Sequence, residues 1–357
     1  MPLLMADDSF ALVTGCPGWL GNRLLHYLRT PHPDWPEDLA PASYERIRCL
    51  VLPDSPTDRL RELAPAVEIV EGDVRDPAAV GRFCAGAQGA TLFHLAGIIH
   101  PRRIADLYAV NAQGTRHVIA AAAAAGVRRV VATSSNSPAG VSRDPGTRFD
   151  ESTPDDPYLN YGRSKAEMEA ALRAASDGEG APETVILRPC WFYGPDQPAR
   201  QTLFFSMIKD GKAPIVGSGE ARRSMSYVDN TSLGLLLAAE RPQAAGRTYW
   251  IADDRPYAMN EIIDTVEAVL RDDFGMAVEG GRRRLPDVAS EVAFAVDATI
   301  QRTGFYEQKI HVLSEMNKTI ACSVDRAREE LGYRPGVALH EGMRRSVEWC
   351  LRNGQRI

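Results

Sequence analysis

A tyrosine and a lysine four residues apart are the side chains in this sequence best suited to acid–base chemistry. They are Tyr161 and Lys165, in a stretch from about Asn160 to Ala175 that predicts a helix. Residues four apart lie on one helix face, one turn from each other. A free tyrosine titrates near pH ~10, and a nearby ammonium group favours the phenolate and lowers that pKa. Such a pair can move a proton on and off a substrate oxygen, although ordinary surface pairs have the same spacing.

A glycine-rich turn follows the first apolar run of the chain. Phe10–Val13 predicts a strand and Asn22–Arg29 predicts a helix, with a G-x-x-G-x-x-G array between them. Glycines in such a turn let backbone N–H groups approach a pyrophosphate, and the helix N-terminus adds partial positive charge. The strand before the array and the helix after it favour dinucleotide binding over an ordinary turn. The residues expected at the cofactor here are Gly15, Gly18, Trp19, Leu20 and Gly21.

Strand and helix patterns alternate six times before Pro195, which predicts a parallel, doubly wound α/β sheet. Such a sheet binds its ligands at the carboxyl ends of its strands. A long helix, from about Arg103 to Ala125, is expected between the fourth and fifth strands. The strands predicted after the first are Ile47–Leu52, Val67–Val70, Thr91–Leu95, Arg129–Thr133 and Thr184–Leu187.

Residues suited to cofactor binding follow several of these strand ends. Asp54 comes shortly after the second strand, where a carboxylate selects NAD and a basic residue selects NADP. The sequence therefore favours NAD, without excluding NADP. Asp73, after the third strand, can accept a hydrogen bond from the adenine amino group, or instead cap the helix that begins at Pro77. Ala96 and Gly97 follow the fourth strand and are small enough to let the backbone approach a ribose.

The alternation stops after Pro195, and the rest of the chain predicts a smaller, discontinuous substrate-binding domain. We expect residues 1–189 and 223–256 to form the dinucleotide-binding domain. Residues 190–222 and 257–357 are expected to form mainly the substrate domain.

Two helices in this later part carry specific expectations. Asp229 is the expected N-cap of a helix that ends at Glu240. Pro286–Thr303 has apolar residues at a four-residue spacing, which predicts a helix face that packs on a core or lines a substrate cleft. This apolar stripe consists of Val288, Val292, Val296 and Ile300.

Composition narrows the class of protein. The chain has 44% hydrophobic and 25% charged residues, as an ordinary soluble globular protein does. A net charge of −6 argues against a nucleic-acid or anionic-membrane partner, because basic residues cluster only at 282–284, which we expect on a solvated loop. The six cysteines lack metal-ligand spacing, so we expect no metal site, no disulfide framework and a cytoplasmic location.

No targeting or membrane segment is expected either. The N-terminus lacks the basic region of a signal peptide, and no apolar run reaches the roughly 18 residues that a membrane span needs. We therefore expect a protein that acts on a small molecule, without a membrane span, and that forms a homodimer.

The combination of the Thr14–Gly21 turn with Ser135, Tyr161 and Lys165 resembles the extended short-chain dehydrogenase/reductase superfamily over nearly the whole chain. The resemblance implies that Tyr161 is the general acid/base and that Ser135 hydrogen-bonds the reacting oxygen. It implies that Lys165 holds the nicotinamide ribose and lowers the pKa of Tyr161. Further likenesses are Asp73-Val74, His94–Gly97, Val110–Thr115, Leu187–Pro189 and Tyr227–Asn230. On this basis Val74, Leu95, Pro189 and Trp191 join the expected cofactor residues, and Asn136 and Tyr193 are expected at the substrate.

Two branches of this superfamily fit the sequence. Thr133–Ser137, Tyr249–Ile251 and the ending Asp325–Pro335 resemble the 3β-hydroxysteroid dehydrogenase-like branch, which implies hydride transfer between NAD and a secondary alcohol or ketone. Gly219–Arg223 resembles the nucleotide-sugar epimerase/dehydratase branch, in which an arginine matching Arg223 binds the substrate diphosphate.

The sequence favours one of the two branches. The second basic motif of the sugar branch, Arg-x-Gly-Asp, and the Thr-Asp-Glu triplet of the dehydratases are missing, so the dehydrogenase branch is favoured. Arg223 is then either a substrate contact or a structural partner of an acidic side chain. A protein that binds NAD(P) without catalysis is a third alternative, which the intact Tyr161 and Lys165 disfavour.

Overall fold

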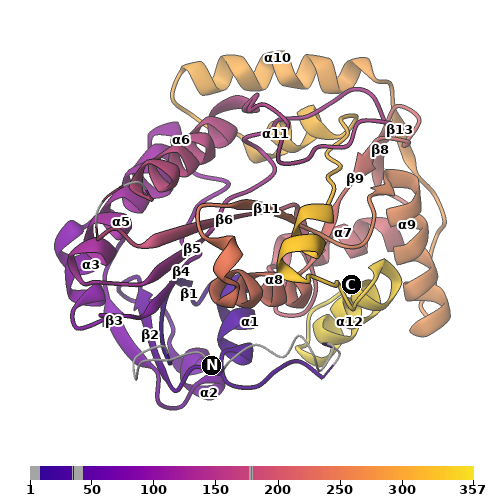
Figure 1. Ribbon diagram of the computed structural model, residues 1–357. Coiled ribbons are helices and arrows are strands. Elements are labelled where there is room, and N and C mark those ends of the chain that lie inside the picture. The colour runs from indigo at the N-terminus through magenta and orange to yellow at the C-terminus, as the bar shows by residue number, and fades with distance from the viewer. Residues whose placement is uncertain (1–8, 34, 36–42, 177, 179) are drawn as a thin grey trace.

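The computed structural model describes residues 9–33, 35, 43–176, 178 and 180–357. Its centre is a seven-stranded sheet with the strand order β11-β6-β5-β4-β1-β2-β3, in which every neighbouring pair is parallel (Figure 1). The strands are β1 (Phe10–Cys16), β2 (Arg46–Val51), β3 (Glu68–Glu71), β4 (Thr91–His94), β5 (Arg129–Thr133), β6 (Glu183–Pro189) and β11 (Thr248–Ile251). The predicted doubly wound α/β fold is confirmed, and its order reverses between β1 and β4, where such sheets bind ligands.

Helices cover both faces of the sheet because successive strand side chains point to opposite sides. Phe10 and Leu12 of β1 lie in a core cluster with residues of α3, α5 and α6. Ala11 and Val13 lie in a second cluster with residues of α1 and α8. These helices are α1 (Trp19–Tyr27), α3 (Pro77–Cys84), α5 (Gly114–Ala124), α6 (Leu159–Ala175) and α8 (Val228–Glu240), and the short α2 (Asp58–Leu63) precedes β3.

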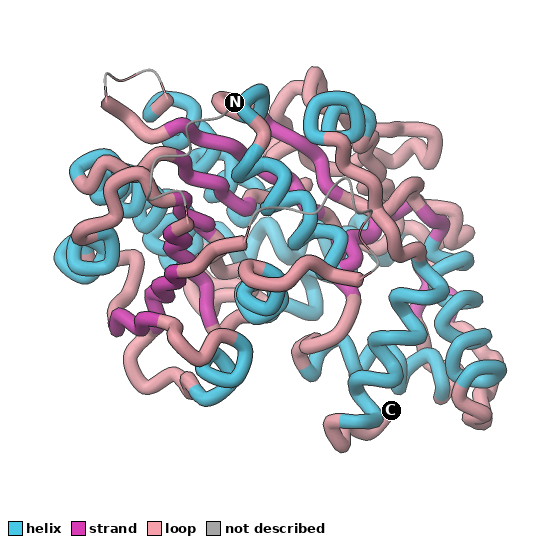
Figure 2. Tube along the Cα trace, turned by 60° about the horizontal axis from the view of Figure 1, so that its bottom comes forward, coloured by secondary structure: helices cyan, strands magenta, loops and turns pink. Residues whose placement is uncertain are grey.

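A third cluster of buried side chains holds most of the later part of the chain together. Figure 2 shows helices of this part gathered on one side of the sheet, near the C-terminus. Its helices are α7 (Ala199–Lys209), α9 (Met259–Ala268), continued by a π-helical turn η4 (Val269–Asp273), and α12 (Leu339–Arg352). Three short strand pairs lie here: β7 (Trp191–Tyr193) with β10 (Met225–Tyr227), β9 (Arg222–Arg223) with β12 (Tyr257–Ala258), and β8 (Pro214–Val216) with β13 (Arg283–Leu285).

Two segments of this later part differ from expectation. Arg283 and Arg284 belong to β13, so the basic triplet lies partly on a strand and not only on a loop. Val324, Leu331 and Tyr333 pack into the core beside α1 and α8. The segment around the π-helical turn η5 (Ala327–Leu331) therefore packs on the main sheet and its helices. A short 3₁₀ turn, η3 (Pro242–Ala244), precedes the edge strand β11.

The helix α10 (Val288–Arg302) buries a different face from the one predicted. Val288, Val292 and Val296 are exposed, so the expectation that this apolar stripe packs on a core or lines a cleft is wrong. The buried face carries Ser290, Ala293, Asp297 and Gln301 instead. Its polar groups are satisfied: Ser290 Oγ donates to the carbonyl of Ser314, and Gln301 Nε2 donates to Asp297. Hydrogen bonds to α11 (Gln308–Glu315) and α6 thus outweigh the apolar pattern, and α10 lies outermost in Figure 1.

Several predicted boundaries and caps also shift. The helix after the glycine turn begins at Trp19, not Asn22. Asp229 is not an N-cap: Tyr227 precedes α8, and Asp229 accepts a hydrogen bond from Arg23 Nε at 2.7 Å. The alternative role of Asp73 as a helix cap is wrong, because Asp76 caps α3 by accepting from the backbone N–H of Ala78.

The long helix predicted from Arg103 to Ala125 is one continuous element with an irregular centre. It runs through α4 (Ile104–Leu107), the π-helical turn η2 (Tyr108–Gln113) and α5. A π turn widens the helix by one residue and re-aims a side chain, often at functional sites. Within the described part of the chain, none of the helices has the length and apolarity needed to cross a membrane.

Candidate active site

Tyr161 and Lys165 project from the first turns of α6 toward the carboxyl ends of β4 and β5. Both are buried, and the Lys165 Nζ atom donates a hydrogen bond to the carbonyl of Thr133, the last residue of β5, at 3.0 Å. Gly97, after β4, leaves room for the same amine: a Cβ at Gly97 would lie 3.2 Å from Nζ. The predicted pair therefore lies at the strand ends where a doubly wound sheet binds its ligands.

The protonation equilibria of this pair differ from the expectation. Burial raises the pKa of Tyr161 to about 12, although the Ser135 hydroxyl partly lowers it. Burial also lowers the pKa of Lys165 to about 8, against the attraction of Glu169. The expected lowering of the Tyr161 pKa by Lys165 is therefore not found in the protein by itself. The physical reason is that desolvation dominates, while the ammonium group is directed to the Thr133 carbonyl.

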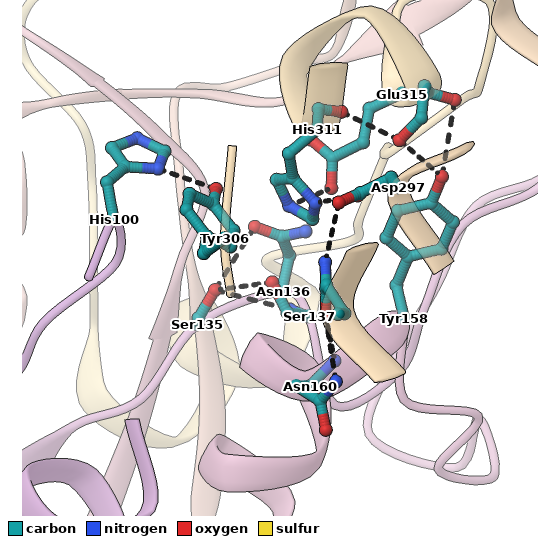
Figure 3. Close-up of polar contacts among 12 residues, drawn as sticks. His100, Ser135, Asn136, Ser137, Tyr158, Asn160, Asp297, Tyr306, His311 and Glu315 are labelled. Atoms are coloured by element: carbon teal, nitrogen blue, oxygen red, sulfur yellow. Dashed lines mark hydrogen bonds and ion pairs between the residues drawn. The ribbon is translucent and has the colours of Figure 1, made fainter. Parts of the chain in front are cut away.

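Ser135 lies two residues after the end of β5, as expected, and is buried together with Ser134 and Ser137. Its Oγ atom accepts a hydrogen bond from the backbone N–H of Ser137 at 3.2 Å and lies 3.1 Å from Ser137 Oγ. It also donates to Asn136 Oδ1 at 3.4 Å. Figure 3 shows Ser135 and Asn136 directed into the same space as the side chains from α11. The structure thus brings Ser135, Tyr161 and the predicted substrate residue Asn136 together.

Asn111 is a site residue whose role the sequence does not reveal. The η2 turn directs its side chain at two segments: Oδ1 accepts from the backbone N–H of Ile98, and Nδ2 donates to the carbonyl of Ile98 and to Ser164 Oγ. Asn111 therefore joins the loop after β4 to the helix that carries Tyr161. The likeness of the Val110–Thr115 stretch to the superfamily was the available signal in the sequence, and the structure shows that Asn111 is fully buried.

The glycine turn is packed so closely that larger residues do not fit. Gly15 has φ +87°, and a Cβ there would lie 2.7 Å from the carbonyl carbon of Leu95. Added Cβ atoms at Gly18 and Gly21 would each lie 2.6 Å from the Gly15 carbonyl oxygen. This close packing leaves the start of α1 open to a pyrophosphate. Trp19 ties the turn to a distant loop, because its Nε1 donates to the Pro195 carbonyl at 2.6 Å.

Unsatisfied polar atoms beside the turn and the Tyr–Lys pair also suit a dinucleotide. Asn22 Oδ1, Thr133 Oγ1 and Ser134 Oγ are buried and find no hydrogen-bond partner among the described residues. Buried polar groups are normally paired. A ligand rich in hydroxyl and phosphate groups, bound along the carboxyl ends of β1 and β5, can supply such partners, so the residues present fit NAD.

The other predicted cofactor residues are placed unevenly around this edge. Ala96 follows β4, and its backbone N–H donates to Thr14 Oγ1. Asp73 is engaged by Arg75, whose guanidinium lowers the pKa of Asp73. Asp54 is exposed with φ 63°, in the turn after β2, and its contact with a ribose stays a prediction.

The remaining predicted cofactor residues lie near the same edge or are partly buried. Val74 is buried against Gly114. Pro189 ends β6, Leu95 follows β4, and Leu20 and Trp191 are partly buried.

The predicted substrate residues Tyr193 and Arg223 are both buried and hydrogen-bonded within the protein. Tyr193 donates its hydroxyl hydrogen to Asp253 Oδ2 at 2.6 Å within the third core cluster, which does not support a substrate role. The Arg223 Nη2 atom donates to the backbone carbonyl of Glu315 at 2.5 Å, and burial lowers the pKa of Arg223. Its partner is therefore a main-chain oxygen at the end of α11, and not an acidic side chain.

A buried polar network from α10 and α11 lies beside the apolar cluster that contains Tyr161. His311 Nδ1 lies 2.7 Å from Asp297 Oδ2, and His311 Nε2 lies 3.6 Å from Glu315 Oε1 (Figure 3). Tyr306 packs against the apolar cluster that contains Tyr161, and its hydroxyl lies 2.7 Å from His100 Nδ1. Sequence reasoning missed this network, because its members are far apart in the chain and follow no motif.

A family model matches this architecture. Residues 11–252 match the model described as the NAD dependent epimerase/dehydratase family, which covers the sheet, the glycine turn and the Tyr–Lys helix. The chain belongs to this family. It is an NAD-dependent enzyme of the extended short-chain dehydrogenase/reductase superfamily, as the resemblance in its sequence implied.

Several related proteins align with this chain over most of its length. An uncharacterised protein of Sinorhizobium fredii is 53% identical over 98% of this chain and 97% of that protein. A 3beta-hydroxysteroid-dehydrogenase/decarboxylase of Arabidopsis thaliana is 29% identical over 79% of this chain and 66% of that protein. A 2-alkyl-3-oxoalkanoate reductase of Shewanella oneidensis is 26% identical over 96% of this chain and 86% of that protein.

Solved structures show the same fold. A dTDP-glucose 4,6-dehydratase of Streptomyces venezuelae, solved with NAD bound, has a TM-score of 0.72 and 26% identity, and covers 96% of this chain and 97% of that one. A UDP-glucose 4-epimerase of Thermotoga maritima has a TM-score of 0.72 at 19% identity, covering 97% and 100%. The second likeness concerns the fold alone.

Proposed function

We propose that this family member transfers hydride between NAD and a secondary alcohol or ketone, as 3β-hydroxysteroid dehydrogenase-like enzymes do, and does not epimerise a nucleotide-sugar. Two of the related proteins, from Arabidopsis thaliana and Shewanella oneidensis, carry a 3-hydroxy or 3-oxo compound in their names. In a 3-oxoalkanoate the ketone oxygen stands near a carboxyl group, so the name of the Shewanella oneidensis reductase supports a substrate with a second functional group near the reacting oxygen.

The observation that carries the proposal is the state of Arg223. In the sugar branch the matching arginine must be free to pair with a diphosphate, to which guanidinium groups bind bidentately. Here its Nη2 donates to the Glu315 carbonyl. Lys318, close to where the second basic motif of that branch is expected, is buried and paired with Glu291. Both cations are therefore engaged within the protein, which disfavours a diphosphate-bearing substrate.

One observation favours the alternative of a nucleotide-sugar epimerase or dehydratase. The Nε atom of Arg223 is buried and finds no partner among the described residues. A phosphate oxygen is a suitable acceptor for such an N–H group. The likeness to the Streptomyces venezuelae dehydratase supports the same alternative.

The residues of this chain have definable tasks in the proposed reaction. NAD supplies the hydride acceptor or donor when bound. Ser135, fixed by the backbone N–H of Ser137, donates a hydrogen bond to the substrate oxygen as charge develops on it. Tyr161 takes or gives the hydroxyl proton. Lys165, held at the end of β5, donates to the ribose.

A substrate panel tests the proposal. A 3β-hydroxysterol, 3-oxoalkanoate esters, UDP-glucose and UDP-galactose are compared by nicotinamide absorbance during turnover and by heat protection in the presence of NAD. We expect turnover of an alcohol or ketone and no protection by either sugar nucleotide. A clear protection by a sugar nucleotide that disappears in Arg223→Ala would establish the epimerase alternative instead.

A further inference from the structure

The polar network of α10 and α11 contains a histidine held like the orienting pairs of acid–base sites. Asp297 is fully buried, accepts a hydrogen bond from Gln301 Nε2 at 2.9 Å and lies 2.7 Å from His311 Nδ1. A carboxylate at Nδ1 fixes the tautomer and leaves Nε2 as the working nitrogen. The ring is further fixed between Tyr306 and Tyr158, at centroid distances of 5.2 and 5.9 Å.

Among the residues that the structure describes, the working nitrogen has no hydrogen-bond partner within ordinary range. His311 Nε2 is 3.6 Å from Glu315 Oε1, longer than the 2.7–3.2 Å typical of N–H···O bonds. Although burial opposes the charge on His311, the hydrogen bond that His311 donates to Asp297 and the charge of Glu315 raise its pKa above the ordinary value. Protonated His311 then presents an N–H donor that the protein itself satisfies poorly.

Tyr306 places this donor beside the cluster of the catalytic tyrosine. Tyr306, which lies against the His311 ring, packs on the cluster of Ile104, Leu107 and Tyr161. The Tyr306 hydroxyl lies 2.7 Å from His100 Nδ1, which fixes the Tyr306 ring between His311 and this cluster. Figure 3 shows the Asn136 amide, hydrogen-bonded to Ser135, pointing toward His311. Ser135 and His311 therefore offer two donors on either side of the Asn136 amide.

We propose that His311 binds a second oxygen of the substrate, a carbonyl or hydroxyl oxygen near the carbon that exchanges hydride. This inference rests on the proposed oxidoreductase function and specifies its substrate class as 3-oxo or 3-hydroxy carbonyl compounds. Asp297 and Glu315 balance the charge of His311, so a neutral acceptor suits the subsite better than an anion. His311 is then a specificity-determining residue, and Asp297 positions it.

Two ketones of equal length test the subsite. Methyl 3-oxooctanoate carries the second oxygen, and decan-5-one has methylene groups in place of the ester. We expect the wild-type enzyme to prefer the oxo ester in kcat/KM by roughly 10- to 100-fold, the range for one hydrogen bond from a charged donor. His311→Gln should lose that preference, because KM for the ester rises by more than KM for decan-5-one.

A matched control is available on the surface. His340 is exposed and lies 3.5 Å from Asp273, so His340→Gln removes a histidine–aspartate pair far from Tyr161 and should keep the preference. Equal loss of both ketone activities in His311→Gln, together with a lower Tm, would assign the residue a structural role and overturn the inference.

A measurement on the wild type does not depend on any variant. The preference should fall as pH rises through the raised pKa of His311, because the neutral ring keeps its proton on Nδ1 beside Asp297 and Nε2 stops donating. The titratable groups facing the ring are Asp297, Glu315, Tyr306 and Tyr158, and His100 stands behind Tyr306 with a pKa that burial lowers to about 4. A pH-independent preference would overturn the inference. Equal rates of the wild-type enzyme on the two ketones would overturn the inference and leave the proposed function intact. Absence of turnover of both ketones would overturn the proposed function as well.

Discussion

Tyr161 and Lys165 lie one turn apart on α6, but their side chains meet different surroundings. The phenol is enclosed by Ile104, Leu107 and Tyr306, whereas the amine reaches the Thr133 carbonyl. A helical spacing indicates that two residues share a face, yet it says nothing about burial, which here sets both pKa values.

Removing the Tyr161 hydroxyl should stop catalysis without affecting cofactor affinity. Tyr161→Phe keeps the ring and deletes the proton carrier, and general acid–base catalysis is worth about 10²–10⁴-fold in rate. We expect kcat to fall by that factor while NADH binding, measured by fluorescence quenching, stays nearly the same. A variant with more than about a tenth of the wild-type activity would contradict the assignment.

Cofactor affinity should depend on pH through Lys165. Because burial lowers the pKa of Lys165 to about 8, the free enzyme loses this charge as pH rises through that value. Only the ammonium form is a charged donor to a ribose hydroxyl, so NADH affinity should be constant below this pH and weaker above it. Lys165→Met should bind NADH weakly at every pH. An unchanged pH profile in that variant would assign the titration to another group.

At the level of elements, features set by neighbouring residues could be predicted from the sequence, whereas features set by contacts between distant segments could not. The strand, turn and helix around Gly15 follow from sequence neighbours, as does the placement of Ser135 at the end of β5. The buried face of α10 could not be predicted, because Asp297 and Gln301 are buried only through partners on α11 and α6. The same reason hid His311, which gains its role only when α10 and α11 pack together.

Arg223 fastens β9 to the end of α11, so its loss should mainly affect stability. Arg223→Ala removes a charged donor to the Glu315 carbonyl, an interaction worth roughly 1.5–3 kcal/mol of unfolding free energy. We expect chemical denaturation to report a loss in that range, with little change in KM for the true substrate. The exposed neighbour Arg222 gives the control, since Arg222→Ala should leave stability unchanged.

At the scale of the whole molecule, distant segments are joined beside the glycine turn. Arg23 of α1 donates to Asp229 of α8 and to Asp196, while Trp19 bonds the Pro195 carbonyl. The cofactor turn is thus connected to the loop where the main sheet gives way to the later part of the chain. The homodimer and the division into two domains stay predictions, and size-exclusion chromatography with light scattering measures the former.

The outer face of α10 provides a test of how this part of the molecule is assembled. Val292 is 56% exposed and Ala293 is 5% exposed, although they are adjacent. Val292→Lys should leave Tm and kcat/KM unchanged, whereas Ala293→Lys buries a charge that costs several kcal/mol. Thermal unfolding of the two variants compares the faces directly. Loss of activity in Val292→Lys would restore the view that the apolar stripe lines the substrate cleft.

The π-helical turn at Tyr108–Gln113 bears on how this chain can change over evolution. An α-helix rotates about 100° per residue, so deleting one residue here would restore a regular helix and rotate the side chains on one side of it by that angle. Asn111 would then leave Ile98 and Ser164, and the loop after β4 would lose its attachment to the Tyr161 helix. Descendants of this gene can therefore vary the identity of surrounding residues more freely than the length of this segment. We expect homologues that keep the catalytic arrangement to keep both the length of this segment and an asparagine at the position of Asn111.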